Sequence, residues 1–390
     1  MTAISVERAA RLLSDLVAMR TVNPMGRPYA SADPVEREAV EYIADLFRPY
    51  PVQVQRLDPS PIHQSLVITV EGRASGPYTL LESHIDTAPA DDWPDVAFVP
   101  RVRDGRLYGR GACDAKGSLV AMIMAVEELL AAGERPPLPV ALLAAADEEY
   151  GQSGIRQFAD LNWPLRQAVI GEPTRLRPIL KHKGVVRWDI TVHGRSAHSS
   201  QPELGCDAIA GAMRVMARLE EHQRRLRERF VSRLMTGPTI TVTMIRGGRT
   251  RNSVADECTL SVDYRMLPGM SPGESRQELI SSLGELGLEL SHGEVQLMAP
   301  PMATAEEDPF AQAALQICRR VTGRSQMAFA GAPYLTDGAW VADRASTIVL
   351  GPGGIENAHA VDEYIEIEEV ARAARIYYEL LMNETYPVSP

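Results

Sequence analysis

The stretch PVALLAAADEEYG (residues 139–151) joins a continuous apolar run to three consecutive acidic residues. An apolar run bounded by proline and acids is typical of a strand buried on both faces of a sheet. In open α/β sheets, ligands bind at the carboxyl ends of such strands. A run of charges usually lies on a solvated surface, but these acids follow a buried strand, where their mutual repulsion requires cations or shared protons. The position therefore favours a functional site.

Outward from this run, strands and helices alternate. Apolar periodicity predicts helices at about 5–18, 34–48 and 116–133, and strands at 52–57, 65–70, 78–82, 167–171 and 347–351. Strands that alternate with helices favour an α/β fold in which helices cover both faces of a sheet.

The middle of the chain has a different order. Strands are predicted at 185–194, 239–248, 257–266 and 288–298, and helices at about 205–230 and 272–286. Together they give β-α-β-β-α-β, the order of the ferredoxin-like split unit. We therefore expect a first domain in two parts, residues 1–181 and 294–390, with a second domain, residues 182–293, inserted between them.

Charge and composition exclude several classes of protein. The 390 residues include 51 acids and 40 bases, so the formal net charge of −11 argues against a nucleic-acid or anionic-membrane partner. No apolar stretch approaches the ~20 residues of a membrane span, and charges interrupt the N-terminal segment where a signal peptide needs an apolar run. The four cysteines form no CxxC pair, so a reduced, cytoplasmic compartment fits best.

Four further polar clusters are candidates for chemistry: SHIDT (83–87), GRGACDAKG (109–117), GEPT (171–174) and IENAH (355–359). Each is a weak signal alone. With the acids after residue 146 they supply two histidines and several carboxylates, a set that suits Zn²⁺ bound by nitrogen and oxygen ligands. The glycine-rich cluster is not a nucleotide-binding phosphate loop, because Asp114 stands where an anion would lie.

In this order and spacing, the five motifs resemble those of the M20 metallopeptidase family, which includes acetylornithine deacetylase, succinyl-diaminopimelate desuccinylase, aminoacylase-1 and glutamate carboxypeptidase. The resemblance spans nearly the whole chain. It implies a zinc-exopeptidase-type mixed sheet flanked by helices, with an inserted ferredoxin-like lid and dimerisation domain. It also implies two divalent metal ions, Zn²⁺ by preference with Co²⁺ as a substitute.

The resemblance assigns a metal role to five residues. Asp114 would bridge the two ions. One ion would be completed by His84 and Glu172, and the other by Glu149 and His359. These ligands come from both ends of the chain, so the metal-binding domain would be the one in two parts.

Further roles follow from the same resemblance. Glu148 would be the general base, and Asp86 would orient the imidazole of His84. His198 would stabilise the oxyanion, and in dimeric relatives this histidine reaches the partner's active site, which favours a homodimer through the lid. The peptide bond Asp114–Ala115 is expected to be cis.

Three residues are expected to bind the substrate. Arg265, Asn252 and Thr336 match family positions near the substrate, and a guanidinium is suited to gripping a carboxylate. A salt bridge on a strand is the competing interpretation of Arg265. The partner would thus be a small N-acyl amino acid.

Several alternatives stay open at this stage. The closing motifs favour a deacylase of the acetylornithine deacetylase type, while GAPYLTDGAW (331–340) leans toward the desuccinylase. A dipeptidase or carboxypeptidase would use the same chemistry. A non-catalytic binding protein on this fold is disfavoured, because no expected ligand or base is missing. The acyl group, the amine, the metal occupancy and the oligomeric state are not determined by the sequence.

Overall fold

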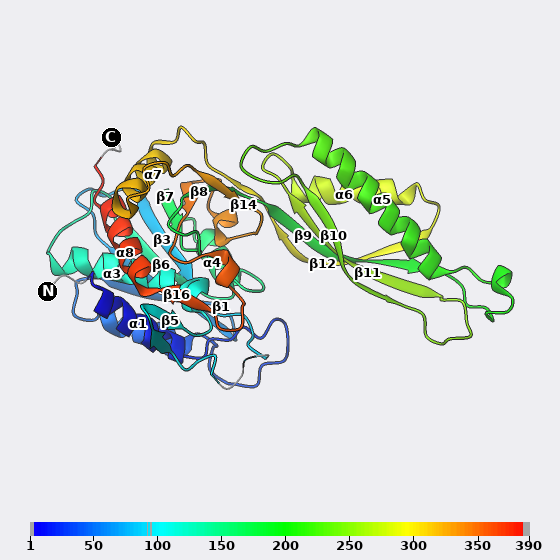
Figure 1. Cartoon of the computed structure of the whole chain (residues 1–390), viewed down its shortest axis with the longest axis horizontal. Helices are drawn as coiled ribbons and strands as arrows, with labels where there is room; N and C mark the ends of the chain where they lie inside the picture. The colour runs from blue at the N-terminus through cyan, green and yellow to red at the C-terminus, as the bar shows by residue number, and fades with distance from the viewer. Residues whose placement is uncertain (1–3, 92, 94–95, 385–390) are drawn as a thin grey trace. The chain divides into compact units, whose positions relative to one another are not determined.

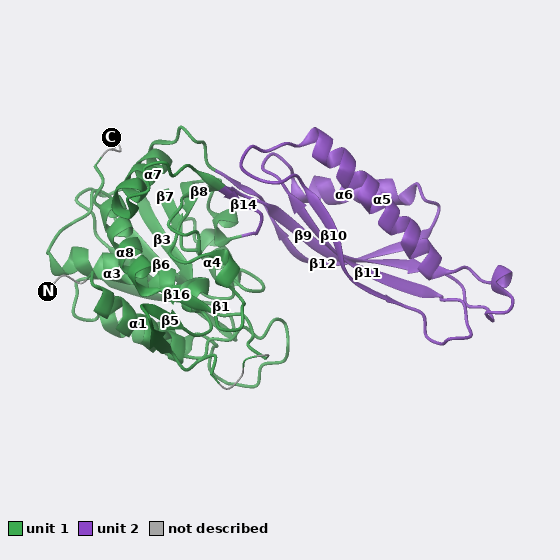
Figure 2. Ribbon diagram, viewed as in Figure 1, with its two compact units in different colours: residues 1–180, 304–330, 336–390 green, residues 181–303, 331–335 purple. Residues whose placement is uncertain are grey.

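The computed structural model describes residues 4–91, 93 and 96–384, which divide into two compact units (Figures 1 and 2). Within the described residues, unit 1 comprises those up to Leu180, Thr304–Ala330 and those from Thr336 onward. Unit 2 comprises Lys181–Ala303 and Gly331–Leu335.

Unit 1 is built on a mixed sheet with strands in the order β1-β2-β6-β3-β7-β15-β8. The strands are β1 (Gln53–Ser60), β2 (His63–Val70), β3 (Tyr78–His84), β6 (Val140–Ala145), β7 (Leu165–Ile170), β8 (Ile179–His182) and β15 (Ser346–Val349). β3, β6, β7 and β15 run parallel to their neighbours in this group, whereas β1 and β2 are antiparallel. The carboxyl ends of the four parallel strands therefore meet at one edge. The apolar run before Asp147 forms β6, and all of the β6 residues are buried.

Helices flank this sheet (Figure 1). They are α1 (Val6–Ala18), α2 (Arg37–Phe47), α3 (Gly117–Ala131), α4 (Ser153–Asp160), α7 (Pro309–Thr322) and α8 (Ile367–Leu381). Buried side chains of α1, α2, α3, α7 and α8 form one core with the sheet, and α4 packs against β1 and β2. Nearly the whole of α3 is buried, because α1 and α8 cover the side that faces away from the sheet. The predicted fold class, a mixed sheet flanked by helices, is confirmed.

Smaller elements complete the description. A second sheet joins β16 (Tyr364–Glu366), β5 (Arg106–Tyr108) and β4 (Arg101–Arg103). An irregular turn, Ala112–Lys116, in which Asp114 and Ala115 have non-helical backbone angles, precedes α3. Two short strands, β13 (Met302–Ala303) and β14 (Ala330–Ala332), pair with β8. The 3₁₀ turns Pro202–Leu204, Asp337–Trp340 and Ile355–Asn357 lie in connections.

Unit 2 has the element order β9-α5-β10-β11-α6-β12, the split order that the sequence predicts. Its elements are β9 (Gly184–His193), α5 (Ala208–Arg229), β10 (Thr239–Gly247), β11 (Glu257–Met266), α6 (Pro272–Gly284) and β12 (Glu289–Ala299). The antiparallel sheet has the order β10-β11-β9-β12, and both helices lie on one face of it (Figure 1). Unit 2 continues to Ala303 rather than ending at 293, because β12 pairs with β9 as far as Ala299.

None of the helices in the described part of the chain is long and apolar enough to cross a membrane.

Gly351 is closely packed against its neighbours. A Cβ atom at Gly351 would lie 2.2 Å from Ser118 Oγ and 2.4 Å from the carbonyl oxygen of Glu172. We expect Gly351→Ala to lower the free energy of unfolding by about 1–3 kcal/mol, the usual cost of overpacking. Urea unfolding measures this. The control is Gly76→Ala, whose Cβ has nothing within 4 Å, and an equal stability for the two variants would contradict the prediction.

Candidate metal centre

The parallel strands bring most of the predicted site residues to one edge of the sheet. His84 is the last residue of β3, Glu148 and Glu149 follow β6, and Glu172 follows β7. His359 lies in the segment after β15, just beyond a 3₁₀ turn. Because these strands are parallel, their carboxyl ends converge, and side chains far apart in sequence meet there.

Asp114 lies between the two histidines. Its Oδ1 is 3.2 Å from His84 Nε2, and its Oδ2 is 3.3 Å from His359 Nε2. Glu149 Oε2 is 3.1 Å from His359 Nε2, and Glu172 Oε1 is 4.0 Å from His84 Nε2. One carboxylate therefore faces two imidazoles through different oxygens, which is the arrangement that a bridging ligand requires.

The side chains fall into two clusters, each with ligand atoms within 4.8 Å of one another. The first cluster is His84, Glu148 and Glu172, and the second cluster is Asp114, Glu149 and His359. Each offers one imidazole nitrogen and two carboxylates, a donor set that suits a divalent ion. Glu148, which the resemblance makes the base, thus lies at ligand distance in the first cluster.

Negative charge dominates both clusters. Burial raises the pKa of Glu148, Glu149 and Glu172 above the usual range, and neighbouring acids add to the effect. Burial opposes ionisation of Asp114 too, but its hydrogen bonds with the two imidazoles outweigh this and hold its pKa low. The hydrogen bonds that His359 forms with Asp114 and Glu149 raise the pKa of its imidazole to about 10.

The clusters fit metal binding for a further reason. Within residues 4–91, 93 and 96–384, no lysine or arginine forms an ion pair with the carboxylates of either cluster. The positive charge that stabilises these acids must therefore come from the two histidines, from protons or from bound cations.

Asp86 acts mainly on the backbone of the acidic loop. Its carboxylate accepts hydrogen bonds from the backbone N–H groups of Glu148 (3.1 Å) and Glu149 (3.2 Å) and from Asn23 Nδ2 (2.9 Å). His84 Nδ1 lies 2.9 Å from the carbonyl oxygen of Asp86 and 3.5 Å from its carboxylate. His84 Nδ1 thus faces Asp86, which leaves Nε2 directed at the cluster.

Glu363 is a supporting residue that the sequence analysis missed. Its fully buried carboxylate accepts backbone hydrogen bonds from Gly111 (3.1 Å), Cys113 (2.8 Å) and Asp114 (3.1 Å). Arg110 Nη1 donates a further bond to it at 2.9 Å. Glu363 thereby fixes the loop that carries Asp114. The expected cis peptide bond at Asp114–Ala115 is present in this loop.

A signal for Glu363 exists in the sequence. It lies four residues after His359, in the same closing motif, and Arg110 Nη2 lies 3.5 Å from the carbonyl oxygen of His359. A second acid so close to a ligand histidine is a candidate for orienting the site.

Two other buried acids were missed. Glu82 lies in β3 and Asp337 in the 3₁₀ turn Asp337–Trp340, and both are almost fully buried. Burial raises the pKa of Glu82 to about 8 and that of Asp337 well above its usual range. Glu82 raises the pKa of Asp337 further, whereas Asp337 acts to lower that of Glu82. Such a pair is stable when it shares a proton.

The predicted substrate residues are divided between the units. Thr336 lies in unit 1, where it is fully buried and its Oγ1 accepts a hydrogen bond from Gly338 N at 3.2 Å. His198, Asn252 and Arg265 lie in unit 2.

In unit 2, His198 and Asn252 are exposed and belong to adjacent loops, joined by a 2.9 Å hydrogen bond from Ser199 N to the carbonyl oxygen of Asn252. Arg265 Nε donates to Asp263 Oδ1 at 2.6 Å. Arg265 thus forms the strand salt bridge that was its competing interpretation.

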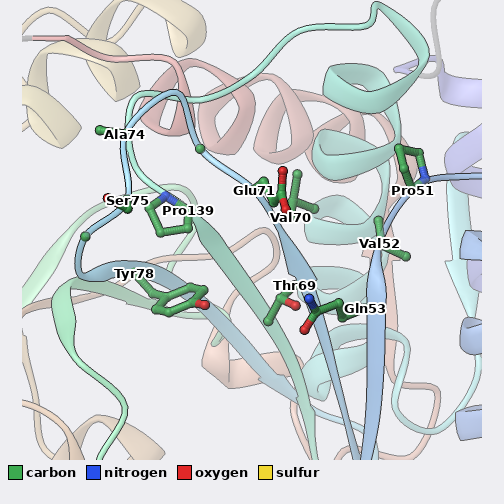
Figure 3. A pocket seen from close by; sticks show the side chains of 12 residues that line it. Pro51, Val52, Gln53, Thr69, Val70, Glu71, Ala74, Ser75, Tyr78 and Pro139 are labelled. Atoms are coloured by element: carbon green, nitrogen blue, oxygen red, sulfur yellow. The ribbon is translucent and has the colours of Figure 1, made fainter.

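A pocket of about 630 Å³ in unit 1 has none of the predicted site residues in its lining (Figure 3). Its lining includes Tyr78, where β3 begins, and Pro139, just before β6. It therefore lies toward the amino ends of the parallel strands, away from the edge that carries both clusters. Glu71 and Tyr78 are the titratable side chains of this lining.

Comparison with solved structures supports the fold. A tripeptidase from Staphylococcus aureus matches with a TM-score of 0.77 and 18% identity, over 97% of this chain and 98% of that chain. An M20 family metallo-carboxypeptidase from Sulfolobus solfataricus matches with a TM-score of 0.75 and 18% identity, over 96% of this chain and 98% of that chain. Human carnosine dipeptidase 1 matches with a TM-score of 0.72 and 16% identity, over 97% of this chain and 96% of that chain. At these identities the likeness shows a shared fold.

Sequence comparison identifies the family. The model of peptidase family M20/M25/M40 matches residues 80–383, which include all the residues of both clusters. The expected resemblance is confirmed: the chain belongs to peptidase family M20/M25/M40 and is a metal-dependent hydrolase of amide or peptide bonds.

Proposed function

We propose that this hydrolase is a two-metal deacylase that removes the acyl group from an N-acyl amino acid, in the manner of acetylornithine deacetylase. The observation that carries the two-metal proposal is Asp114, whose two oxygens face His84 and His359 separately. Asp114 would bridge, His84 and Glu172 would hold one ion, and Glu149 and His359 would hold the other. Zn²⁺ is the proposed metal, because imidazole and carboxylate suit it, and Co²⁺ can replace it.

Proton transfer is assigned to Glu148. When bound, two divalent ions supply the positive charge that lowers the pKa of a water molecule and stabilises the oxyanion. Glu148 takes a proton from that water and later delivers it to the leaving amine. Asp86 holds the backbone of this loop in place by accepting the Glu148 N–H.

Unit 2 would supply the rest of the reaction. His198 would donate a hydrogen bond to the oxyanion, and Arg265 and Asn252, with Thr336 of unit 1, would bind the substrate. Arg265 would have to exchange or share its present partner, Asp263, when a substrate carboxylate arrives. As in dimeric relatives, unit 2 would act as the lid and form a homodimer that carries His198 to the partner's site.

We place the enzyme in the cytoplasm, because its cysteines, Cys113, Cys206, Cys258 and Cys318, are all free.

A peptidase specificity is the second candidate. The matching folds include proteins described as a tripeptidase, a metallo-carboxypeptidase and a carnosine dipeptidase, and the same two clusters would cleave a peptide bond. The loop GAPYLTDGAW (331–340) also leaves a desuccinylase-like specificity as an alternative.

A substrate panel tests the specificity. We expect acetylated amino acids, acetylornithine among them, to release free amine faster than succinyl-diaminopimelate, dipeptides or tripeptides when the protein is loaded with Zn²⁺ or Co²⁺. Comparison of kcat/KM across the panel is the measurement. Faster cleavage of the peptides would replace the deacylase proposal with the peptidase one.

Metal content tests the two-cluster assignment. We expect two ions per chain after Zn²⁺ loading and dialysis, and one ion per chain for His359→Ala, because the second cluster loses its imidazole. Elemental analysis measures both. The control is His193→Ala, an exposed histidine bonded to Ser291, and two tightly held ions in His359→Ala would contradict the assignment.

Replacement of the base tests the mechanism. We expect Glu148→Gln to lower kcat by about 10²–10⁴-fold, because general acid–base catalysis contributes that much, while both ions remain bound. Steady-state kinetics and metal analysis of the same sample separate the two effects. Normal turnover in this variant would show that another group carries the proton. The control is Glu203→Gln, which replaces an exposed acid.

A further inference from the structure

Gln152 makes direct contact with the proposed base. It precedes α4, is 1% exposed, and has a left-handed backbone with a φ of 52°. Its Nε2 donates a hydrogen bond to Glu148 Oε1 at 3.3 Å. Among the described residues, Gln152 is the one side chain that donates a hydrogen bond to this carboxylate. A side chain so deeply buried, on a backbone conformation that suits glycine better, is well placed to have a specific task.

Trp340 determines which way the Gln152 amide points. The indole Nε1 of Trp340 lies 3.0 Å from Gln152 Oε1. An indole N–H can only donate, so the amide oxygen must face it and the amide nitrogen must face Glu148. The Trp340 ring is itself held, because the Arg156 guanidinium lies 5.1 Å from its centroid.

The contact matters because Glu148 has two competing uses. Its carboxylate lies within 4.8 Å of the ligand atoms of His84 and Glu172, close enough for all three to bind the same ion. A carboxylate that binds a cation is a poor proton acceptor, since the cation stabilises its charged form. A donor that occupies one of its oxygens restrains it from moving onto the ion.

An amide is suited to this task. A lysine or arginine at the same position would pair with the base and repel the ions, whereas a neutral donor does neither.

We propose that Gln152, oriented by Trp340, is a positioning residue that keeps Glu148 from binding the ion of the first cluster. Glu148 thereby remains free to accept a proton. The catalytic part of this inference rests on the proposed function, but its effect on metal affinity does not.

Metal affinity gives a test whose direction separates this proposal from a structural role. The apo forms of wild type and Gln152→Met are titrated with Zn²⁺ in competition with a chelator. We expect one ion to bind about tenfold more tightly to Gln152→Met, because Glu148 becomes a ligand and adds negative charge to the site. A structural or orienting role would weaken binding instead, typically by about 10–100-fold.

Two further comparisons make the test specific. In a Glu148→Ala background the gain in affinity from Gln152→Met should disappear, because the carboxylate that would bind the ion is absent. Trp340→Phe should shift the affinity in the same direction but less, since the amide remains and loses only its orientation. Gln157→Met is the matched control on α4, where the side chain bonds to the carbonyl oxygen of Asp58, and should leave the affinity unchanged.

Activity supplies the second readout. With a substrate from the panel, we expect Gln152→Met to lower kcat about tenfold or more with little change in KM. Unchanged or weaker metal binding in Gln152→Met overturns the inference, as does a gain that persists without the Glu148 carboxylate. If wild type binds two ions but cleaves nothing in the panel, the proposed specificity fails while the affinity comparison still decides the role of Gln152.

Discussion

Crowded negative charge is the constraint on which the rest of unit 1 depends. Four carboxylates and two imidazoles share one edge of a sheet, and no described lysine or arginine is paired with those acids. A buried charge without a partner destabilises a fold by several kcal/mol, so acids placed like these are not expected in a core that has no function. The loops at this edge bring them together, and the two proposed cations would offset their repulsion. The neighbouring acids Asp86 and Glu363 carry no such requirement, because backbone N–H groups and Arg110 satisfy them.

The site is therefore organised in two shells of acids with different partners. The inner acids face the imidazoles, while the outer acids accept backbone hydrogen bonds from the loops that carry the inner ones. Gln152 belongs to the outer shell by position but donates rather than accepts, and it contacts the one inner acid that would have to give and take a proton. In our proposal, this hydrogen bond is what distinguishes Glu148, the proposed base, from the acids proposed as ligands.

Much of the fold and of the candidate site could be predicted from the sequence, because both are marked by local residue patterns. The apolar run before Asp147 is a strand of the predicted kind, and the period-two pattern of 257–266 matches β11 residue for residue. His84, Glu149 and Glu172 cluster because they lie at the carboxyl ends of parallel strands, whereas Asp114 is placed by a turn that Glu363 fixes. What was missed depends on contacts between distant segments: Glu363 meets Cys113 across 250 residues of sequence, and Trp340 meets Gln152 across 188. Helices α7 and α8 were not assigned, although their apolar periodicity is ordinary.

Glu363 bonds to backbone groups of Cys113 and Asp114, far earlier in the chain, so the site is completed late in synthesis. On the ribosome, the loop with Asp114 emerges early, whereas His359 and Glu363 emerge only after the whole of unit 2 has been synthesised. Until then the acids after β6 have neither the imidazole of the second cluster nor the carboxylate that fixes their neighbour. Loading with the two proposed ions would therefore belong to the end of synthesis, and a chain released before residue 359 would lack His359 from its second cluster.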